Sequence, residues 1–259
     1  MSLIEYEQRD GIAYITFNRP EVLNALTDDM VKEFRQTLFR FDDDEDANVA
    51  ILSGAGRAFC SGADVRQRRL RPIEELRRLG AAQSRDSRIQ ELMYGFTNWK
   101  PIIAAVHGYA VGAGLYIALT CDMIVASEGT KFQITETSLG TDATNFWFLL
   151  RDRANDGFAT DVSLTGRFWT AEEAMPVGAI DRLCKPGDHL ETATQLVRDE
   201  ILPNPPLSVR AVVEMRRGTN QQIELEAYLR RPRGLHLTDD FRESALAFVE
   251  KRKPVFHGR

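Results

Sequence analysis

Apolar residues along this chain follow two kinds of pattern, short β-rich runs and longer stretches with helical spacing. The run Gly11–Phe17 has the β-branched and aromatic content of a strand, and it stops at a turn of Asn18, Arg19 and Pro20. Thr27 stands where a helix N-cap is expected, with two acidic residues in the turn that follows. The apolar positions after it recur at near-helical spacing and predict one buried stripe: Met30, Phe34, Leu38 and Phe41.

The same alternation continues through the middle of the chain and then changes. Buried strands are predicted at Val49–Leu52, Ile102–Val106 and Met123–Ala126, with a shorter extended piece at Lys131–Ile134. Leu115–Thr120 is predicted to be the start of an apolar helix. After about residue 185 the strand signals vanish, and helices are predicted at Leu190–Ile201, Leu207–Arg217, Ile223–Arg230 and Asp239–Lys253. Strands that alternate with helices predict an α/β body, here followed by a helical C-terminal part.

Composition and charge exclude several classes of protein. Of the 259 residues, 43% are apolar, which is too many for a disordered chain and enough to form a substantial core. The longest apolar stretches, such as Ile102–Val106, are far shorter than the roughly 18 residues that span a bilayer, and no secretory leader is evident. The 33 Lys and Arg residues against 38 Asp and Glu give a net charge of −5, which favours neither nucleic acid nor an anionic membrane as partner. We expect a soluble, cytoplasmic protein.

Residue types that bind metals or form disulfides are few and scattered. Cys60, Cys121 and Cys184 never form a CxxC pair, and the histidines show no HxxxH spacing. We therefore expect no metal site, and we expect the cysteines to be small buried residues of a reducing compartment. The acidic run Asp42–Asp46 is interpreted as a solvated helix end and loop. The arginine-rich run Arg66–Arg78 is interpreted as a solvated loop and helix, with phosphate binding as a secondary alternative.

Two loops rich in small residues are the strongest candidates for chemistry. Ala58–Val65 follows one predicted strand, and His107–Gly114 follows another and precedes a helix. A glycine-rich junction between strand and helix leaves backbone N–H groups approachable at the positive end of the helix dipole. Two such loops, if they converge, can hold one developing oxyanion between two N–H donors. Neither loop has the spacing of a nucleotide-binding loop, and Ser61 lies in CSGA rather than in GxSxG.

Six segments, in order along nearly the whole chain, resemble those of the crotonase, or enoyl-CoA hydratase/isomerase, superfamily. They are FNRPEVLNAL, GAGRAFCSGADV, KPIIAAVHGYAVGAGLYIALTCDMIVAS, KFQITETSLG, SLTGRFWTAEEAMPVGAIDRL and FRESALAFVEKRKPVFHGR. The resemblance implies an α/β fold with a spiral core of ββα repeats over residues 1–195 and a helical trimerisation region over residues 196–259. It also implies an acyl-CoA thioester substrate, no cofactor besides the CoA of that substrate, and a homotrimer or dimer of trimers.

The resemblance further implies roles for four residues. Ala63 in SGAD and Ala113 in VGAG match the amides of the family's oxyanion hole, and Glu136 in QITETSLG matches its later catalytic glutamate. Tyr116 replaces the earlier glutamate of the hydratases, because its separation of 20 residues from Glu136 equals theirs. Tyrosine is a poor general base at neutral pH, since its unperturbed pKa is about 10. Its hydroxyl can still donate a hydrogen bond or position a water, and the alternative is a ring that only packs.

Weaker matches imply contacts with CoA and the acyl group. Segments that lie along the pantetheine and adenine in the family are matched by Val22, Leu23, Asp64 and Val65. Phe248 and Lys251 match positions that relatives project onto the CoA of a neighbouring subunit, although a solvated terminal helix explains them equally well. Asp142 is either an auxiliary acid or a helix N-cap, and the bulky residues after it, beginning with Phe146, indicate an altered acyl pocket.

Three functions are compatible with these residues. A single proton shuttle at Glu136 suits the hydration or the double-bond isomerisation of an enoyl-CoA. A CoA-thioester hydrolase or a C–C lyase would use the same enolate platform. A non-catalytic scaffold with this fold is the third, and the intact SGAD and VGAG loops together with Glu136 argue against it.

Overall fold

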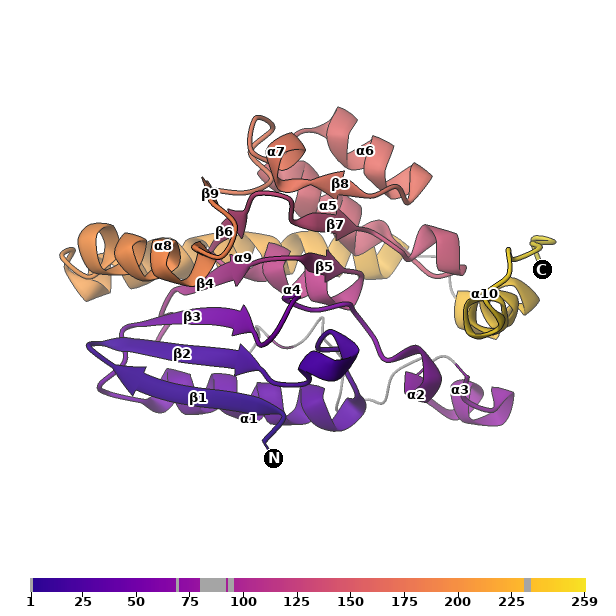
Figure 1. Cartoon of the computed structure of the whole chain (residues 1–259), viewed down its shortest axis with the longest axis horizontal. Coiled ribbons are helices and arrows are strands. Elements are labelled where there is room, and N and C mark those ends of the chain that lie inside the picture. Colours follow the sequence, from indigo (N-terminus) through magenta and orange to yellow (C-terminus); the bar gives the residue numbers. More distant parts are fainter. Residues whose placement is uncertain (1, 69, 80–91, 93–95, 231–233) are drawn as a thin grey trace.

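The computed structural model describes residues 2–68, 70–79, 92, 96–230 and 234–259 (Figure 1). The main sheet has the strand order β1-β2-β3-β4-β6-β9. These strands are β1 (Ile4–Arg9), β2 (Ile12–Phe17), β3 (Val49–Gly54), β4 (Ile102–Val106), β6 (Met123–Ser127) and β9 (Arg182–Cys184). Strands β1 and β2 pair antiparallel, and all later neighbours pair in parallel. Parallel neighbours need long crossovers, which fits the alternation of strands and helices in the sequence.

The helices surround this sheet. They are α1 (Asp28–Asp43), α2 (Val65–Arg68), α3 (Ile73–Leu79), α4 (Ala113–Thr120), α5 (Thr144–Arg153), α6 (Asp156–Thr165), α7 (Ala171–Ala174), α8 (His189–Leu196), α9 (Pro206–Arg230) and α10 (Asp239–Glu250). Helix α1 begins as predicted, because the Thr27 side chain accepts a hydrogen bond from the Met30 amide at 3.2 Å. The predicted stripe, Met30, Phe34, Leu38 and Phe41, is buried, so local sequence was sufficient for this helix.

Both faces of the main sheet are buried, which explains why its strands are almost continuously apolar. In β2, Ala13, Ile15 and Phe17 join a large core that includes the buried residues of α1. The alternate residues Ile12 and Tyr14 face a second core that is closed by α8 and the π-helical turn Val197–Ile201. The period-two alternation along the strand therefore divides its side chains between two helical layers.

A second, smaller sheet lies beside the first. It contains β5 (Tyr109–Val111), β7 (Lys131–Gln133) and β8 (Trp169–Thr170), in which β5 and β7 pair in parallel and β7 and β8 pair antiparallel. A bridge between Cys60 and Ala110 joins the loop after β3 to this sheet. The small sheet thus brings the two candidate loops together.

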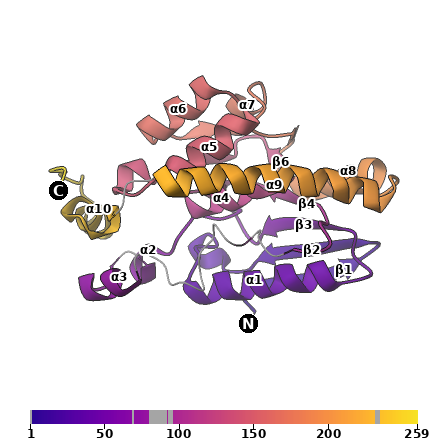
Figure 2. The same cartoon turned by 180° about the vertical axis from the view of Figure 1, so that it is seen from behind.

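The C-terminal helices occupy two places in the molecule. Figure 2 shows α9 crossing the back of the molecule, behind the main sheet. Helix α10 and the C-terminus lie at one end, above α2 and α3, in both views (Figures 1 and 2). The predicted boundary between residues 195 and 196 falls in the last turn of α8, and this division into two regions stays a prediction.

Three predictions about elements are wrong in detail. The predicted break between Arg217 and Ile223 does not exist, because α9 continues through Gly218. The segment His107–Gly114 is not loop throughout, since it contains β5 and the first turn of α4. Within the charged runs, Asp42 is 4% and Arg68 2% exposed, so these two side chains are buried rather than solvated. Residue 69, in the arginine-rich run, lies outside the described residues.

The cysteines agree with their interpretation in part. All three are free thiols, of which Cys60 and Cys121 are buried and Cys184 is half-buried. Burial raises the pKa of the Cys60 thiol to about 12, so this sulfur is an inert packing group. Among the described residues, no helix combines the length and the hydropathy that a membrane crossing requires.

Candidate active site

A cavity of about 470 Å³ lies where the two candidate loops, the segment after β7 and helices α2 and α10 meet. Figures 1 and 2 both show α2 and α10 at the end of the molecule toward which β2 and β3 run. The wall of the cavity is formed by residues from five parts of the chain: 61–63, 65 and 68, 111–113, 133–146, and 244–248. The cavity therefore contains residues of both predicted loops together with Glu136.

Backbone hydrogen bonds fix the first loop against the second. The Cys60 amide donates to Tyr109 O at 3.0 Å, and the Val111 amide donates to Cys60 O at 3.0 Å. Gly62 follows with φ +96°, and a Cβ added there would lie 2.8 Å from Val111 O and 3.5 Å from the Ala113 nitrogen. Only glycine permits this approach, because a side chain would collide with a backbone carbonyl. The loops are thus in direct contact beside Ala63 and Ala113.

The Ala63 and Ala113 amides line the cavity and remain available as donors. Gly62 O accepts from Leu26 at 2.8 Å and the Asp64 amide donates to Leu26 O at 2.9 Å, so the intervening Ala63 N–H faces the opposite side of this extended segment. Ala113 is the first residue of α4, where an N–H has no intrahelical partner. Within the described part of the chain, neither amide donates a hydrogen bond. The cavity wall therefore contains two residues whose N–H groups have no acceptor among the described residues.

Glu136 lies against the second loop. A Cβ added to Gly112 would be 3.4 Å from Glu136 Oε1 and 3.9 Å from Oε2, so the carboxylate is next to the residue that precedes Ala113. The Gly112 amide donates to Gln133 O at 2.9 Å, and the Thr135 hydroxyl donates to Glu136 Oε2 at 3.4 Å. The Glu136 carbonyl also accepts from the Thr141 amide at 2.8 Å. The half-buried acid is thus held on a fixed backbone within the same cavity as the two amides.

Tyr116 is buried one layer behind the cavity wall. Its side chain is 1% exposed, and it is not among the described residues that line the cavity. Its ring packs edge-to-face on Phe146, with centroids 5.4 Å apart, and Phe146 itself lines the cavity. Burial raises the pKa of its hydroxyl above the ordinary value, and the Asn145 side chain opposes this rise. Tyr116 therefore supports Phe146, and its direct catalytic role stays a prediction.

Five of the other predicted site residues lie in the wall of the cavity or beside it. Val65, Asp142 and Phe248 line the cavity, whereas Leu23 and Asp64 lie in segments that frame it. Asp142 Oδ1 accepts from the Thr144 amide at 2.9 Å and from the Thr144 hydroxyl, so it also stabilises the start of α5. This position lies one residue before the helix N-cap, which is Ala143.

The predicted residues Val22, Leu23 and Lys251 are better described by their backbone roles. Leu23 O accepts from the Ser61 amide at 2.9 Å, and Val22 O accepts from the Ser61 hydroxyl at 3.4 Å, so both support the wall of the cavity near its edge. Lys251 is the C-cap of α10, in the left-handed conformation with φ 55°, and is exposed. Among the described residues, Val22, Leu23, Asp64 and Lys251 do not line the cavity.

One charged residue of the wall was not predicted from the sequence. Arg68 lines the cavity, although its arginine-rich run was expected to be solvated. Polar wall residues such as Gln133, Thr135 and Ser244 were also missed. The proximity of Gln133 and Thr135 to Glu136 in the sequence could have indicated these two, whereas Arg68 and Ser244 come from segments that meet by tertiary packing.

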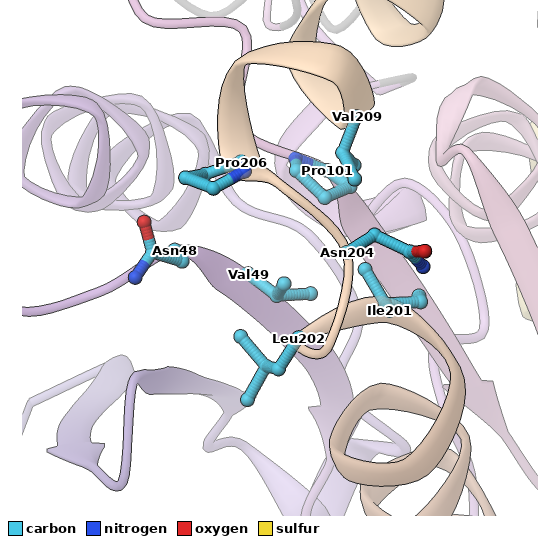
Figure 3. Close-up of a pocket in the computed structure, with 8 residues that line it drawn as sticks. All are labelled: Asn48, Val49, Pro101, Ile201, Leu202, Asn204, Pro206 and Val209. Atoms are coloured by element: carbon cyan, nitrogen blue, oxygen red, sulfur yellow. The ribbon is translucent and has the colours of Figure 1, made fainter.

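Two further cavities have a different character. Figure 3 shows one of about 60 Å³ between the start of β3 and the connection from α8 to α9, and none of its described lining residues is titratable. The other, of about 300 Å³, is lined by paired charges: Arg153 bonds Asp181 at 3.2 Å and Arg216 bonds Asp122 at 3.0 Å. No group of three or more potential metal-ligating side chains occurs among the residues with described positions. The cavity with the two free amides is therefore the candidate site.

Comparison with known proteins covers the whole chain. The sequence model of the family described as Enoyl-CoA hydratase/isomerase matches residues 7–259. The chain is 34% identical to the (E)-benzylidenesuccinyl-CoA hydratase of Thauera aromatica, over 98% of this chain and 99% of that protein. It is 36% identical to an enoyl-CoA hydratase of Mycobacterium tuberculosis, over 98% and 96% of the two chains. A solved carnitinyl-CoA dehydratase from Mycobacterium avium matches 100% of both chains with a TM-score of 0.78 at 29% identity.

Proposed function

The chain belongs to the enoyl-CoA hydratase/isomerase family, with the crotonase fold, and from that premise we propose that it hydrates an enoyl-CoA thioester, or dehydrates the corresponding hydroxyacyl-CoA, in the cavity of Ala63, Ala113 and Glu136. The observation that carries the proposal is the meeting of two amides without acceptors and one carboxylate in a single cavity. Hydration has priority because the two curated relatives are named hydratases and the solved structure a dehydratase.

The two amides stabilise the thioester carbonyl as it becomes an enolate oxyanion. Both N–H groups are fixed before substrate binds, since their loops are hydrogen-bonded to each other and to Leu26. A preorganised donor of this kind contributes most when charge develops, and removal of one donor typically costs about 3–4 kcal/mol of barrier. Alanine suits both positions, because the backbone donates and a larger side chain would obstruct the thioester.

Glu136 serves as the acid and base of the reaction. In hydration its carboxylate takes a proton from water as the water oxygen bonds to the β-carbon, and the electron pair of the double bond moves into the enolate. The α-carbon of the enolate then takes a proton, which Glu136 can return, and the thioester carbonyl is restored. The carboxylate lies against Gly112, next to the Ala113 donor, so the proton and the oxyanion are handled on adjacent sides of the acyl group.

Isomerisation of the double bond is a second candidate. It is favoured by the replacement of the earlier hydratase glutamate with Tyr116, a buried phenol with a raised pKa that cannot act as a base. A single carboxylate suffices to move a proton between two carbons of one enolate. Thioester hydrolysis and C–C cleavage would use the same oxyanion donors, and no feature of the described cavity favours either.

A homotrimer or dimer of trimers is proposed for the assembly. Large apolar side chains of α9 are exposed in the single chain, including Val212 at 70% and Met215 at 74%. They recur at helical spacing with Leu225 and Leu229, along the helix that crosses the back of the molecule in Figure 2. Several large apolar side chains exposed on one surface helix are typical of a subunit interface. Light scattering on the purified protein measures the assembly directly.

Deuterium exchange tests the catalytic proposal. The wild type and Glu136→Gln are incubated with 2-enoyl-CoA and 3-enoyl-CoA thioesters in deuterated water, with Glu128→Gln as control because Glu128 is exposed and outside the cavity. We expect the wild type and the control to introduce deuterium at the α-carbon, and Glu136→Gln to lose this activity. A product that gains water selects hydration, and a shifted double bond without added water selects isomerisation. Equal exchange by all three proteins would exclude Glu136 as the shuttle.

A further inference from the structure

A buried arginine lines the same cavity as the reacting groups. Arg68 ends α2, which begins at Val65, two residues after the Ala63 donor. Its side chain is 2% exposed, and it is the only cation among the described residues of the wall, which also include the carboxylates of Glu136 and Asp142. An unbranched apolar acyl chain would gain nothing from such a group, since burial of a guanidinium is unfavourable unless anions or other acceptors surround it.

The protein itself supplies Arg68 with a shared counter-ion. Arg68 Nε lies 3.3 Å from Asp28 Oδ1 at the start of α1, and the other oxygen of this carboxylate binds Arg71. Asp28 therefore divides its charge between two guanidinium groups. Burial lowers the pKa of Arg68 to about 10, opposed by Asp28 and reinforced by Arg71, so the side chain is still cationic at neutral pH.

The position of this cation relative to the thioester selects a class of substrate. Arg68 lies one helical turn beyond Asp64, whose carbonyl accepts from the Arg68 amide at 2.9 Å, and Asp64 directly follows the Ala63 donor. A thioester carbonyl held by Ala63 would thus direct its acyl chain into a cavity with a fixed positive charge in its wall. The planar fork of a guanidinium matches a carboxylate in geometry and in charge.

We propose that the acyl group of the substrate carries a carboxylate, at its end or on a short branch, which pairs with Arg68. This inference rests on the proposed function, since it assumes that the thioester binds between Ala63 and Ala113. In this arrangement one end of the acyl group is held by the two amides and the other by the buried arginine, with Glu136 beside the carbons between them. Arg68 is a specificity residue that touches substrate and takes no part in proton transfer.

The experiment compares matched pairs of thioesters that differ only in this charge. A short series of 2-enoyl-CoA compounds with a terminal or branched carboxylate is assayed beside the methyl ester of each. We expect the wild type to prefer the best acid over its ester by about 10- to 100-fold in kcat/KM, which is the range of a hydrogen bond to a charged group. Arg68→Met should abolish the preference, and Arg68→Lys should keep part of it, because an ammonium retains charge but lacks the fork. Arg66→Met is the matched control, since Arg66 is exposed on the same helix and should keep the wild-type ratio.

Binding measurements separate this inference from the proposed function. Calorimetry with saturated acyl-CoA acids and esters measures the same preference without any reaction. Selective binding of acids with no turnover of any thioester would support Arg68 as the anion site while contradicting the proposed chemistry. Turnover with an acid-to-ester ratio near one in the wild type, or an unchanged ratio in Arg68→Met, would overturn the inference and leave the chemistry standing. Failure to bind either form would overturn both.

A purely structural role makes a different prediction. If Arg68 only ties α2 to α1 through Asp28, Arg68→Met lowers the melting temperature and alters acids and esters alike. Should this variant fail to fold, the wild-type comparison and Arg68→Lys still decide, because both keep a cation at the position. Equal kcat/KM for the acid and its ester in the wild type and in Arg68→Lys would then contradict the inference.

Discussion

Gly62→Ala tests whether the contact between the two loops creates the site. The added methyl would be 2.8 Å from Val111 O, and the backbone at this residue has φ +96°, where L residues are strained. Strain of this kind costs about 1–2 kcal/mol, and forced overpacking typically adds about 1–3 kcal/mol. The obstructing atom is a backbone carbonyl that cannot rotate away, so the loops must separate, and the Ala63 and Ala113 amides must separate with them.

The assay compares Gly62→Ala with Gly187→Ala. Gly187 has nearly the same φ, +93°, but a Cβ there meets no described atom within 4 Å, so this control carries the strain without the collision. We expect urea unfolding to show a loss of about 1 kcal/mol for the control and a larger loss for Gly62→Ala. Only Gly62→Ala should lose activity, by about 10²- to 10³-fold in kcat, the effect of removing one oxyanion donor. Wild-type kcat in a folded Gly62→Ala would show that the approach of the loops is irrelevant to catalysis.

Three further predictions concern buried polar groups. Tyr116→Phe removes a buried polar hydroxyl beside Asn145, so we expect a loss of about 1 kcal/mol in unfolding free energy with little change in kcat. A fall in kcat of more than about tenfold would give the hydroxyl a catalytic role. Asp42→Ala removes the carboxylate that accepts hydrogen bonds from the Thr97 and Asn98 amides at 2.8 and 3.1 Å, and it should lower the free energy of unfolding by about 3 kcal/mol. Asp43→Ala, at an exposed residue of the same helix end, should be nearly neutral in chemical denaturation. Burial, and then His107 stacked on it at 4.1 Å, lower the pKa of His189 to about 4. The free energy of unfolding should therefore be highest above about pH 6.5, the pKa of histidine in the unfolded chain, and should decrease as the pH falls toward 4. In His189→Gln, unfolding measured as a function of pH should show a smaller decrease.

Helix α1 and the two loops of the site could be recognised from the sequence, whereas the buried arginine in the cavity wall could not. Helix α1 is specified by an N-cap and an apolar stripe, both of which act within a few residues. The Ala63 and Ala113 loops have a recognisable pattern, and the structure brings them into one cavity with Glu136. Arg68 is different, because its burial depends on the docking of α2 against Asp28, which is 40 residues away in sequence. An arginine within an arginine-rich run gives no local indication that it is buried.

The errors in the elements have similar physical causes. Two helices were predicted where α9 runs without a break through Gly218. A glycine in a helix costs only about 1 kcal/mol, and packing overrides that cost. Arg217 beside it is 3% exposed and bonds Asp122 at 2.6 Å, so tertiary contacts hold this turn in the helix. Tyr116 was identified as a replacement for a catalytic group, but its position behind Phe146 depends on how α4 packs on α5.

In the proposed reaction Glu136 moves the proton while the Ala63 and Ala113 amides hold the enolate. Its most direct test is deuterium uptake at the α-carbon of an enoyl-CoA by wild type, Glu136→Gln and the exposed control Glu128→Gln. We expect exchange by the wild type and the control, and loss of exchange in Glu136→Gln although this variant still binds the thioester. Exchange at the wild-type rate in Glu136→Gln would contradict it.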